Sequence, residues 1–121
     1  MAIPKDVMEH PDYYELSGNG VKLLNEVARQ YTTYNNGKLC IVWSQLKGRG
    51  FKSQTTLNRA KKELLDRNLI MLTKRGYFSQ GARLPNYYAL TWARIDEISG
   101  FDMDVPPSSK AIRLFKQNVP P

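Results

Sequence analysis

The feature that most constrains this chain is a basic amphipathic stretch at residues 52–68. Ser53 can cap the start of a helix by accepting a hydrogen bond from a free backbone N–H, and Asn68 can adopt the left-handed conformation that ends one. At about 100° per residue, the apolar residues that share one side are Leu57, Ala60, Leu64 and, at its edge, Leu65. The residues that point away are Thr55, Asn58, Arg59 and Lys62. The sequence therefore predicts one helix with a polar, basic outer face.

Two interpretations of this outer face are open. Amides, hydroxyls and cations suit the major groove of DNA, where base edges offer donors and acceptors. A solvated surface helix would carry the same residues for solubility alone. The charge distribution favours DNA, because residues 44–83 hold ten basic and two acidic residues, a balance of +8, while the rest of the chain balances to −1. Positive charge gathered in one region is typical of a protein that binds a polyanion.

Length and composition set broad limits on the fold. A chain of 121 residues with 41% hydrophobic content predicts one globular domain with a single core. No apolar run is long enough to span a bilayer, and the first twelve residues lack the apolar centre of a secretory signal, so we expect a cytoplasmic protein without membrane association. A lone Cys40 cannot form an internal disulfide, which agrees with a reducing compartment.

The region before the basic helix predicts two helices and a strand. Ser17 can cap a helix that runs to about residue 31, with apolar residues at helical spacing. Asn35, Asn36 and Gly37 form a turn signal, because these residues tolerate positive φ. Residues 39–43 are β-rich and predict a strand. Residues 44–47 predict a very short helix, which the glycines of residues 48–50 end; two helices around such a turn make a helix-turn-helix.

The region after the basic helix predicts a hairpin with a long connection. Residues 69–74 and 86–92 are β-rich and of strand length. The connection, residues 75–85, is longer than a tight hairpin needs and carries two arginines and two glycines. It predicts either a flexible basic wing or a disordered loop.

The order helix, strand, short helix, basic helix and hairpin resembles the winged helix-turn-helix proteins that bind DNA, and in particular small helix-turn-helix proteins of phages, prophages and mobile elements. The residues that carry the resemblance are Leu16-Ser17, Asn35-Asn36-Gly37, Arg59-Ala60, Glu63-Leu64, Thr73-Lys74-Arg75-Gly76 and Leu90-Thr91-Trp92. The resemblance covers about residues 3–92. It implies an α+β fold with a three-helix core, a small antiparallel sheet and a basic wing. It further implies a role in transcription regulation, or in replication and maintenance of such an element.

The chain departs from this family in two places. Lys61 occupies a position that is usually apolar, and the turn at residues 48–52 is longer than the compact form. We expect Leu65 and Phe51 to supply the missing core contacts, with the stem of Lys61 lying along apolar surface and its amine reaching water.

The domain boundaries that follow are an N-terminal arm at residues 1–16, a winged helix-turn-helix domain at 17–92 and a C-terminal extension at 93–121. The arm holds two prolines and predicts an irregular segment with at most a turn of helix, which residues 11–16 could form. In the extension, residues 108–117 predict two helical turns that could dock on their own domain, on a second subunit or on another protein. A homodimer could use either the arm or the extension.

The predicted partner is double-stranded DNA, with different residues for bases and for phosphates. The first two turns of a recognition helix lie deepest in the groove, which predicts base contacts by Gln54, Thr55, Asn58 and Arg59. Residues at the flanks or in the wing are predicted to contact phosphate: Lys47, Lys52, Ser53, Lys62, Lys74, Arg75 and Arg83. The alternative is a winged-helix interaction module whose basic face binds an acidic protein.

Catalytic and metal-binding patterns are nearly absent from the sequence. His10 is the only histidine and Cys40 the only cysteine, so a Cys/His zinc set cannot be assembled from one chain. The carboxylates at residues 96–104 show no spacing typical of a catalytic pair, and the glycines are too sparse for a phosphate-binding loop. We expect no enzymatic activity, no metal and no cofactor.

Overall fold

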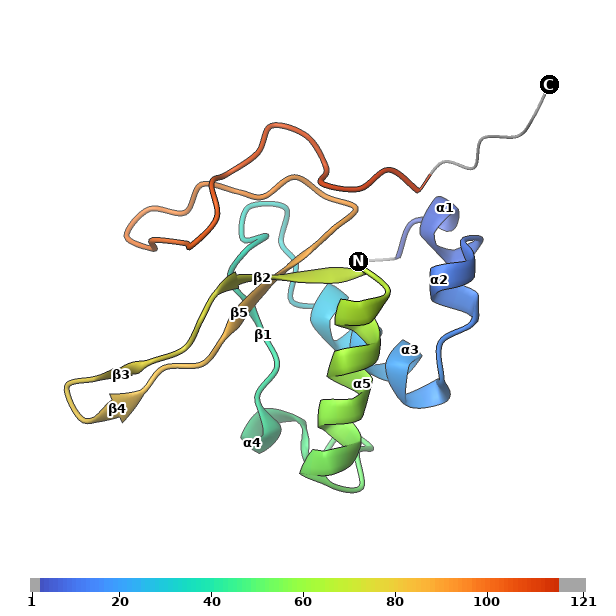
Figure 1. Cartoon of the computed structure of the whole chain (residues 1–121), viewed down its shortest axis with the longest axis horizontal. Helices are drawn as coiled ribbons and strands as arrows, with labels where there is room; N and C mark the ends of the chain where they lie inside the picture. Colours follow the sequence, from blue (N-terminus) through green and yellow to red (C-terminus); the bar gives the residue numbers. More distant parts are fainter. Residues whose placement is uncertain (1–2, 116–121) are drawn as a thin grey trace.

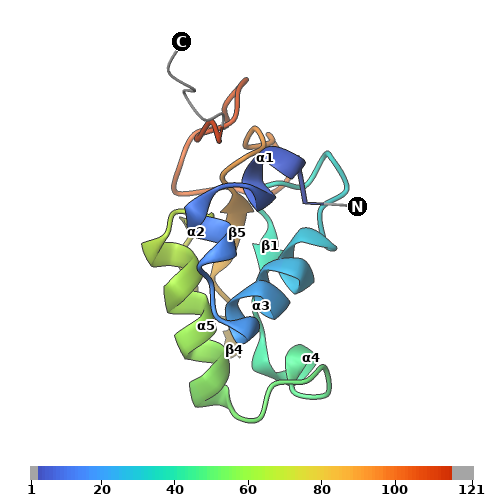
Figure 2. The ribbon, with the colours of Figure 1, turned by 90° about the vertical axis from the view of Figure 1, so that its right-hand side faces the viewer.

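A computed structural model describes residues 3–115 and has mixed α+β architecture. The helices are α1 (Lys5–Met8), α2 (Pro11–Tyr14), α3 (Gly18–Ala28), α4 (Trp43–Leu46) and α5 (Gln54–Asp66). The strands are β1 (Leu39–Cys40), β2 (Ile70–Lys74), β3 (Phe78–Ser79), β4 (Ala82–Arg83) and β5 (Tyr87–Leu90). Helices α3 and α5 pack against each other beside the sheet of β1, β5 and β2, and the β3–β4 hairpin projects from that sheet (Figures 1 and 2).

The two long helices begin and end for local reasons. Ser17 and Ser53 cap them by accepting hydrogen bonds from the N–H groups of Gly20, at 3.0 Å, and Thr56, at 3.1 Å. Asn68, with φ of +55°, follows the end of α5 in the left-handed conformation. The predicted basic helix is therefore confirmed, including its two end signals.

Helix α3 ends at Ala28, three residues before the predicted end. The side chain of Asn35 ends it, because its Nδ2 donates to the carbonyl of Gln30 at 2.8 Å and its Oδ1 accepts from the N–H of Thr32 at 2.9 Å. After Ala28 the chain makes only a tighter turn, in which the N–H groups of Gln30 and Tyr31 donate to the carbonyls of Val27 and Ala28, each at 3.1 Å, and the Asn35 bonds satisfy the backbone groups that follow.

The core lies between α3, α5 and the sheet. Its buried members include Leu23, Leu24 and Val27 of α3, Leu57 and Leu64 of α5, and Leu39, Ile70 and Leu90 of the sheet. Phe51 is also buried and Leu65 is half-buried against the core, as expected from the departure at Lys61. Burial of these side chains is the main stabilising contribution to the fold.

The main sheet is antiparallel, in the order β1-β5-β2. Leu39 of β1 pairs with Tyr88 of β5, and Ile70 of β2 pairs with Leu90 of β5. These pairs confirm that the first strand lies beside the predicted hairpin, which β2 and β5 form. The predicted strand at residues 39–43 was too long, because only residues 39–40 pair. The carbonyl of Val42 accepts from two N–H groups of the next turn, at 3.0 and 3.1 Å, so the chain leaves the ladder and Trp43 begins α4.

The connection at residues 75–85 forms the two-stranded β3–β4 hairpin rather than a disordered loop. Gln80 and Gly81 both have positive φ, +51° and +78°, which a tight two-residue turn of this twist requires. At the base of the hairpin, a Cβ on Gly76 would lie 2.2 Å from the carbonyl oxygen of Leu84, so only glycine allows this close approach.

The N-terminal segment carries more structure than the irregular arm we expected. It forms both α1 and α2, and Ile3 and Val7 are buried in the same core as α3 and α5. The Nδ1 atom of His10 caps α2 by accepting from the N–H of Asp12 at 3.1 Å. The segment therefore packs as part of the core that the long helices form.

The prediction of helical turns at residues 108–117 is wrong for residues 108–115, and residues 116–117 lie outside the described residues. Ala111 makes a β-bridge with Arg94, and the N–H of Arg113 donates to the carbonyl of Thr91 at 2.9 Å. Flanking prolines and these backbone bonds favour an extended path. Phe115 is buried among the core residues, so the extension docks on its own domain.

Arg113 connects the two ends of the chain. Its guanidinium forms an ion pair with Asp12 and donates to the carbonyl of Arg67 at 2.7 Å. Burial raises the pKa of Asp12, but the hydrogen bond and charge of Arg113, with the charge of Arg67, outweigh it and hold that pKa below 3.8. The carboxylate is therefore stabilised in its charged form.

Asn36 binds the start of β1 to the end of β5. Its side chain has no exposed surface and bonds to the backbone of Leu90, Ala93 and Arg94. Its backbone N–H donates to Asp96 Oδ2 at 2.9 Å, and its carbonyl accepts from the N–H of Asp96, also at 2.9 Å. The residue predicted as part of a turn is thus also a central tertiary contact.

Candidate functional site

The ten basic residues of the middle third of the chain, residues 44–83, fall into two groups. Four of them have partners within the chain: Arg49 pairs with Glu26, Lys62 with Asp66, Arg67 with Asp12 and Glu15, and Lys74 donates to the carbonyl of Asp102. Six have no carboxylate within ion-pair distance among residues 3–115: Lys47, Lys52, Arg59, Lys61, Arg75 and Arg83. The second group extends from α4 through α5 to the β3–β4 hairpin and is available for a negatively charged ligand.

Helix α5 exposes all four residues predicted to contact bases. Leu57, Ala60 and Leu64 are buried, which turns the opposite side of the helix to solvent. The exposed residues on that side are Gln54, Thr55, Asn58 and Arg59. None of these four side chains forms a hydrogen bond or ion pair within the described part of the chain. They lie in the first two turns of the helix and present amide, hydroxyl and guanidinium groups together.

The acidic residues of α5 are both occupied. Glu63 accepts from the Ser17 hydroxyl at 2.9 Å and from the Ser17 N–H at 3.3 Å, which ties α5 to the start of α3. Asp66 accepts from the amine of Lys62 at 2.7 Å. Since both carboxylates lie in the second half of α5, the exposed face of its first half carries no negative charge.

The residues predicted to contact phosphate lie in several different environments. Lys47 and Lys52 are exposed before α5, while the hydroxyl of Ser53 is occupied as the helix cap. The amine of Lys62 is held by Asp66, and that of Lys74 lies 5.1 Å from the ring centre of Phe101 and donates to the Asp102 carbonyl at 2.6 Å.

The two arginines of the connection are free of carboxylates. Arg75 is exposed, although its backbone N–H donates to Asp104 Oδ2 at 2.9 Å. The exposed guanidinium of Arg83 lies 5.9 Å from the ring centre of Phe78. Sequence reasoning could not separate these two from Lys74, because the partners of Lys74 are 27 and 28 residues away in the chain. The partner of Lys62 is Asp66, four residues later on the same helix, which was a local signal that the sequence analysis did not use.

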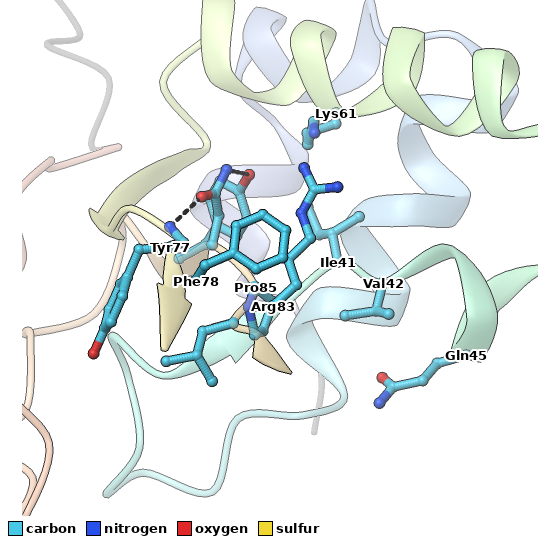
Figure 3. A pocket seen from close by; sticks show the side chains of 12 residues that line it. Ile41, Val42, Gln45, Lys61, Tyr77, Phe78, Arg83 and Pro85 are labelled. Atoms are coloured by element: carbon cyan, nitrogen blue, oxygen red, sulfur yellow. Dashed lines mark hydrogen bonds between the residues drawn. The ribbon is translucent and has the colours of Figure 1, made fainter. Parts of the chain in front are cut away.

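A groove of about 570 Å³ lies between the β3–β4 hairpin and a surface formed by residues 41–45 and by Lys61 of α5 (Figure 3). Its lining from the body of the protein includes Ile41, Val42, Gln45 and Lys61, and its lining from the hairpin includes Tyr77, Phe78, Arg83, Leu84 and Pro85. The side chain of Arg83 extends toward the side on which Lys61 lies (Figure 3). The groove therefore combines apolar and aromatic walls with two cations.

Sequence reasoning missed Lys61, Tyr77, Phe78 and Gln45 as candidate site residues. Lys61 was treated as a departure from an apolar pattern; it is half-buried and lines the groove instead. Two consecutive aromatics in a connection rich in arginine and glycine were the signal that could have identified Tyr77 and Phe78. An exposed aromatic pair on a hairpin is unusual enough to suggest a ligand surface.

Comparison with protein-family models, with curated proteins and with solved structures gives no match for this chain.

Two observations concern other kinds of site. Across residues 3–115, no group of three or more His, Cys, Asp or Glu side chains is arranged to hold a metal ion. Among the helices of the same range, none combines the length and the apolar character needed to cross a membrane.

Proposed function

We propose that this protein binds double-stranded DNA with sequence selectivity, as a winged helix-turn-helix protein. In this proposal α4 and α5 form the helix-turn-helix, α5 is the recognition helix and the β3–β4 hairpin is the wing. The observation that carries the proposal is the exposed face of the first half of α5. It presents four polar side chains without internal partners or acidic neighbours on the helix, between free cations on both flanks.

The proposal assigns different work to the helix and to its flanks. Gln54, Thr55, Asn58 and Arg59 can form hydrogen bonds with base edges in the major groove, which differ between base pairs. Free cations before the helix and on the hairpin are placed to neutralise phosphates, which adds affinity for every sequence alike. The free cations assigned to phosphate are Lys47, Lys52, Lys61, Arg75 and Arg83. Lys62, Lys74 and Ser53, which have internal partners, contribute less unless binding exchanges those partners.

The cellular role we propose follows from the resemblance of the sequence. It is transcription regulation, or replication and maintenance of a phage or mobile element.

Salt-dependent binding to duplex DNA tests the proposal. Five neutralised phosphates predict a slope of about −4 to −5 when log affinity is plotted against log salt. The measurement is fluorescence anisotropy on a labelled duplex, with a preferred site first obtained by selection from random DNA. Absence of binding to any duplex at low salt would refute the proposal and favour an acidic protein partner.

A charge-matched pair of variants gives this test its control. Arg83→Gln should reduce the steepness of the slope by about 1, because it removes one phosphate contact. Lys110→Gln removes the same charge from an exposed position on the C-terminal extension and should leave the slope unchanged. Equal effects of both variants would mean that net charge alone, and not the placement of the cations, determines binding.

A further inference from the structure

The aromatic residues of the β3–β4 hairpin are unusually exposed. Phe78 is 75% exposed and Tyr77 is 50% exposed, on a hairpin that projects away from the helices (Figure 1). Two hydrogen bonds hold the base of this hairpin: Asn86 Oδ1 accepts from the N–H of Gly76 at 2.6 Å, and the N–H of Leu84 donates to the carbonyl of Tyr77 at 2.8 Å. The hairpin therefore holds two apolar rings in water at a fixed place.

Tyr77 and Phe78 both line the groove that Lys61 and Arg83 also line. The Phe78 ring lies beside Arg83, while the Tyr77 ring points away from the two cations (Figure 3). The apolar side chains of Ile41, Val42, Leu84 and Pro85 complete its walls. A surface that only contacted phosphates would need the cations and would gain nothing from exposed aromatic and aliphatic walls. A flat, apolar group with a negative charge next to it matches both properties of the groove.

We propose that this groove binds a single unpaired nucleotide of the DNA, with its base stacked on Phe78 and its adjoining phosphates near Arg83 and Lys61. The proposal rests on the DNA-binding function proposed above and adds a structural preference to it. Every nucleobase has a π face, so stacking on an aromatic side chain requires no particular sequence. The guanidinium of Arg83 lies over the Phe78 ring, 5.9 Å from its centre, which places positive charge next to the surface on which the base would stack.

A fully paired duplex cannot use this groove in the same way. Its bases are stacked on one another and show only their edges in the grooves, while its backbone is charged and polar. A base that is already unpaired can leave the helix at a small cost, whereas a paired base must first be unstacked and unpaired. The protein should therefore prefer a duplex with one extrahelical nucleotide over the same duplex fully paired.

The test compares two labelled duplexes of the same sequence, one fully paired and one with a single extra 2-aminopurine nucleotide in one strand. We expect the bulged duplex to bind on the order of tenfold more tightly. Stacking on Phe78 should change the 2-aminopurine fluorescence on binding. Equal affinity for both duplexes would overturn the inference while leaving duplex binding intact, whereas no binding to either would overturn the proposed function itself.

Variants at Phe78 connect the preference to the ring. Phe78→Ala and Phe78→Leu should abolish the preference for the bulged duplex, measured as the ratio of the two affinities, while Phe78→Trp should retain it. Tyr34→Ala is the control, because Tyr34 is 76% exposed but does not line the groove. Circular dichroism should show all four variants folded, since both side chains are largely exposed. A preference that persists in Phe78→Ala would overturn the assignment of the groove.

Discussion

Replacing Asn36 by alanine should destabilise this protein more than most single substitutions. The side-chain Nδ2 lies 3.0, 3.2 and 2.8 Å from the carbonyl oxygens of Leu90, Ala93 and Arg94, and Oδ1 accepts from the N–H of Leu90 at 2.7 Å. Alanine removes all of these contacts. The backbone bonds between residue 36 and Asp96 do not involve the side chain and should remain.

The magnitude follows from which groups lose their partners. The N–H of Leu90 is buried and would have no acceptor, and leaving such a donor unsatisfied costs about 1–3 kcal/mol. The carbonyl of Leu90 would lose one bond in the interior, while those of Ala93 and Arg94 are closer to solvent and can bind water. We therefore expect a loss of about 2–4 kcal/mol, which corresponds to a fall in melting temperature of about 10 °C.

Urea unfolding followed by circular dichroism measures this loss, with an unchanged m-value as the sign that only stability has changed. The matched control is Asn35→Ala. Asn35 is the neighbouring residue of the same type and also makes two side-chain hydrogen bonds, but it is partly exposed, so its loss should cost about 1 kcal/mol or less. Equal losses in the two variants would refute the argument that burial of the Asn36 contacts determines their effect.

Three further predictions follow from the same structure. Asn58→Ala and Arg59→Ala should each weaken binding to the preferred DNA site by about 1–3 kcal/mol and binding to a scrambled site little, which parallel titrations on both duplexes will measure. Ser17→Ala should lower the free energy of unfolding by about 1 kcal/mol, since the Gly20 N–H and the Glu63 carboxylate both lose a hydrogen-bond partner. Urea titrations will measure this loss, and the control Ser44→Ala, at an exposed position, should leave the free energy of unfolding unchanged. The folded pKa of Asp12 lies below 3.8, so the stability that its carboxylate contributes is present above that pH and is lost as the pH falls through the folded pKa. The urea midpoint of unfolding, measured from pH 7 to pH 3, should therefore fall less steeply with falling pH in Asp12→Asn than in the wild type.

The parts of the fold that sequence predicted well are those with local causes. Ser53 and Asn68 mark the ends of α5 through backbone groups within a few residues of each. The strands β2 and β5 follow from β-rich runs, and their pairing follows from their proximity in the chain. The exposed side of α5 also follows from local periodicity, which is why all four predicted base-contact residues are exposed together.

The parts that sequence did not predict depend on contacts between distant residues. Asn36 was recognised only as a turn residue, because its partners at Leu90 to Asp96 lie 54 to 60 positions further along. The path of residues 108–115 depends on a bridge to Arg94 and a bond to Thr91, and neither is visible in the local pattern, which favoured a helix. The burial of Val7 likewise depends on the helices that it packs against.

The charge of the middle third shows how the structure changes a conclusion drawn from composition. The sequence places ten basic residues in this region, but four of them are bound to groups of the chain itself. Arg49, for example, shares Glu26 with Arg29. The number of cations free for a ligand is therefore a better basis than net charge for the salt dependence we predict.

The long turn between α4 and α5 is one possible reason why Asn58→Ala and Arg59→Ala could fail to change base discrimination. A mobile turn could let α5 shift or rotate within the major groove of the DNA. The assignment of Asn58 and Arg59 to base contacts would then be wrong. The structure instead fixes this turn to α3: the amine of Lys22 donates to the carbonyl of Gly50 at 3.0 Å, and Phe51 is buried in the core. If both alanine variants weakened the preferred and the scrambled duplex equally, a mobile turn would therefore be a poor explanation. Lys22→Met separates the cases, because it removes the bond to Gly50 and should alter base discrimination only if the turn controls the position of α5.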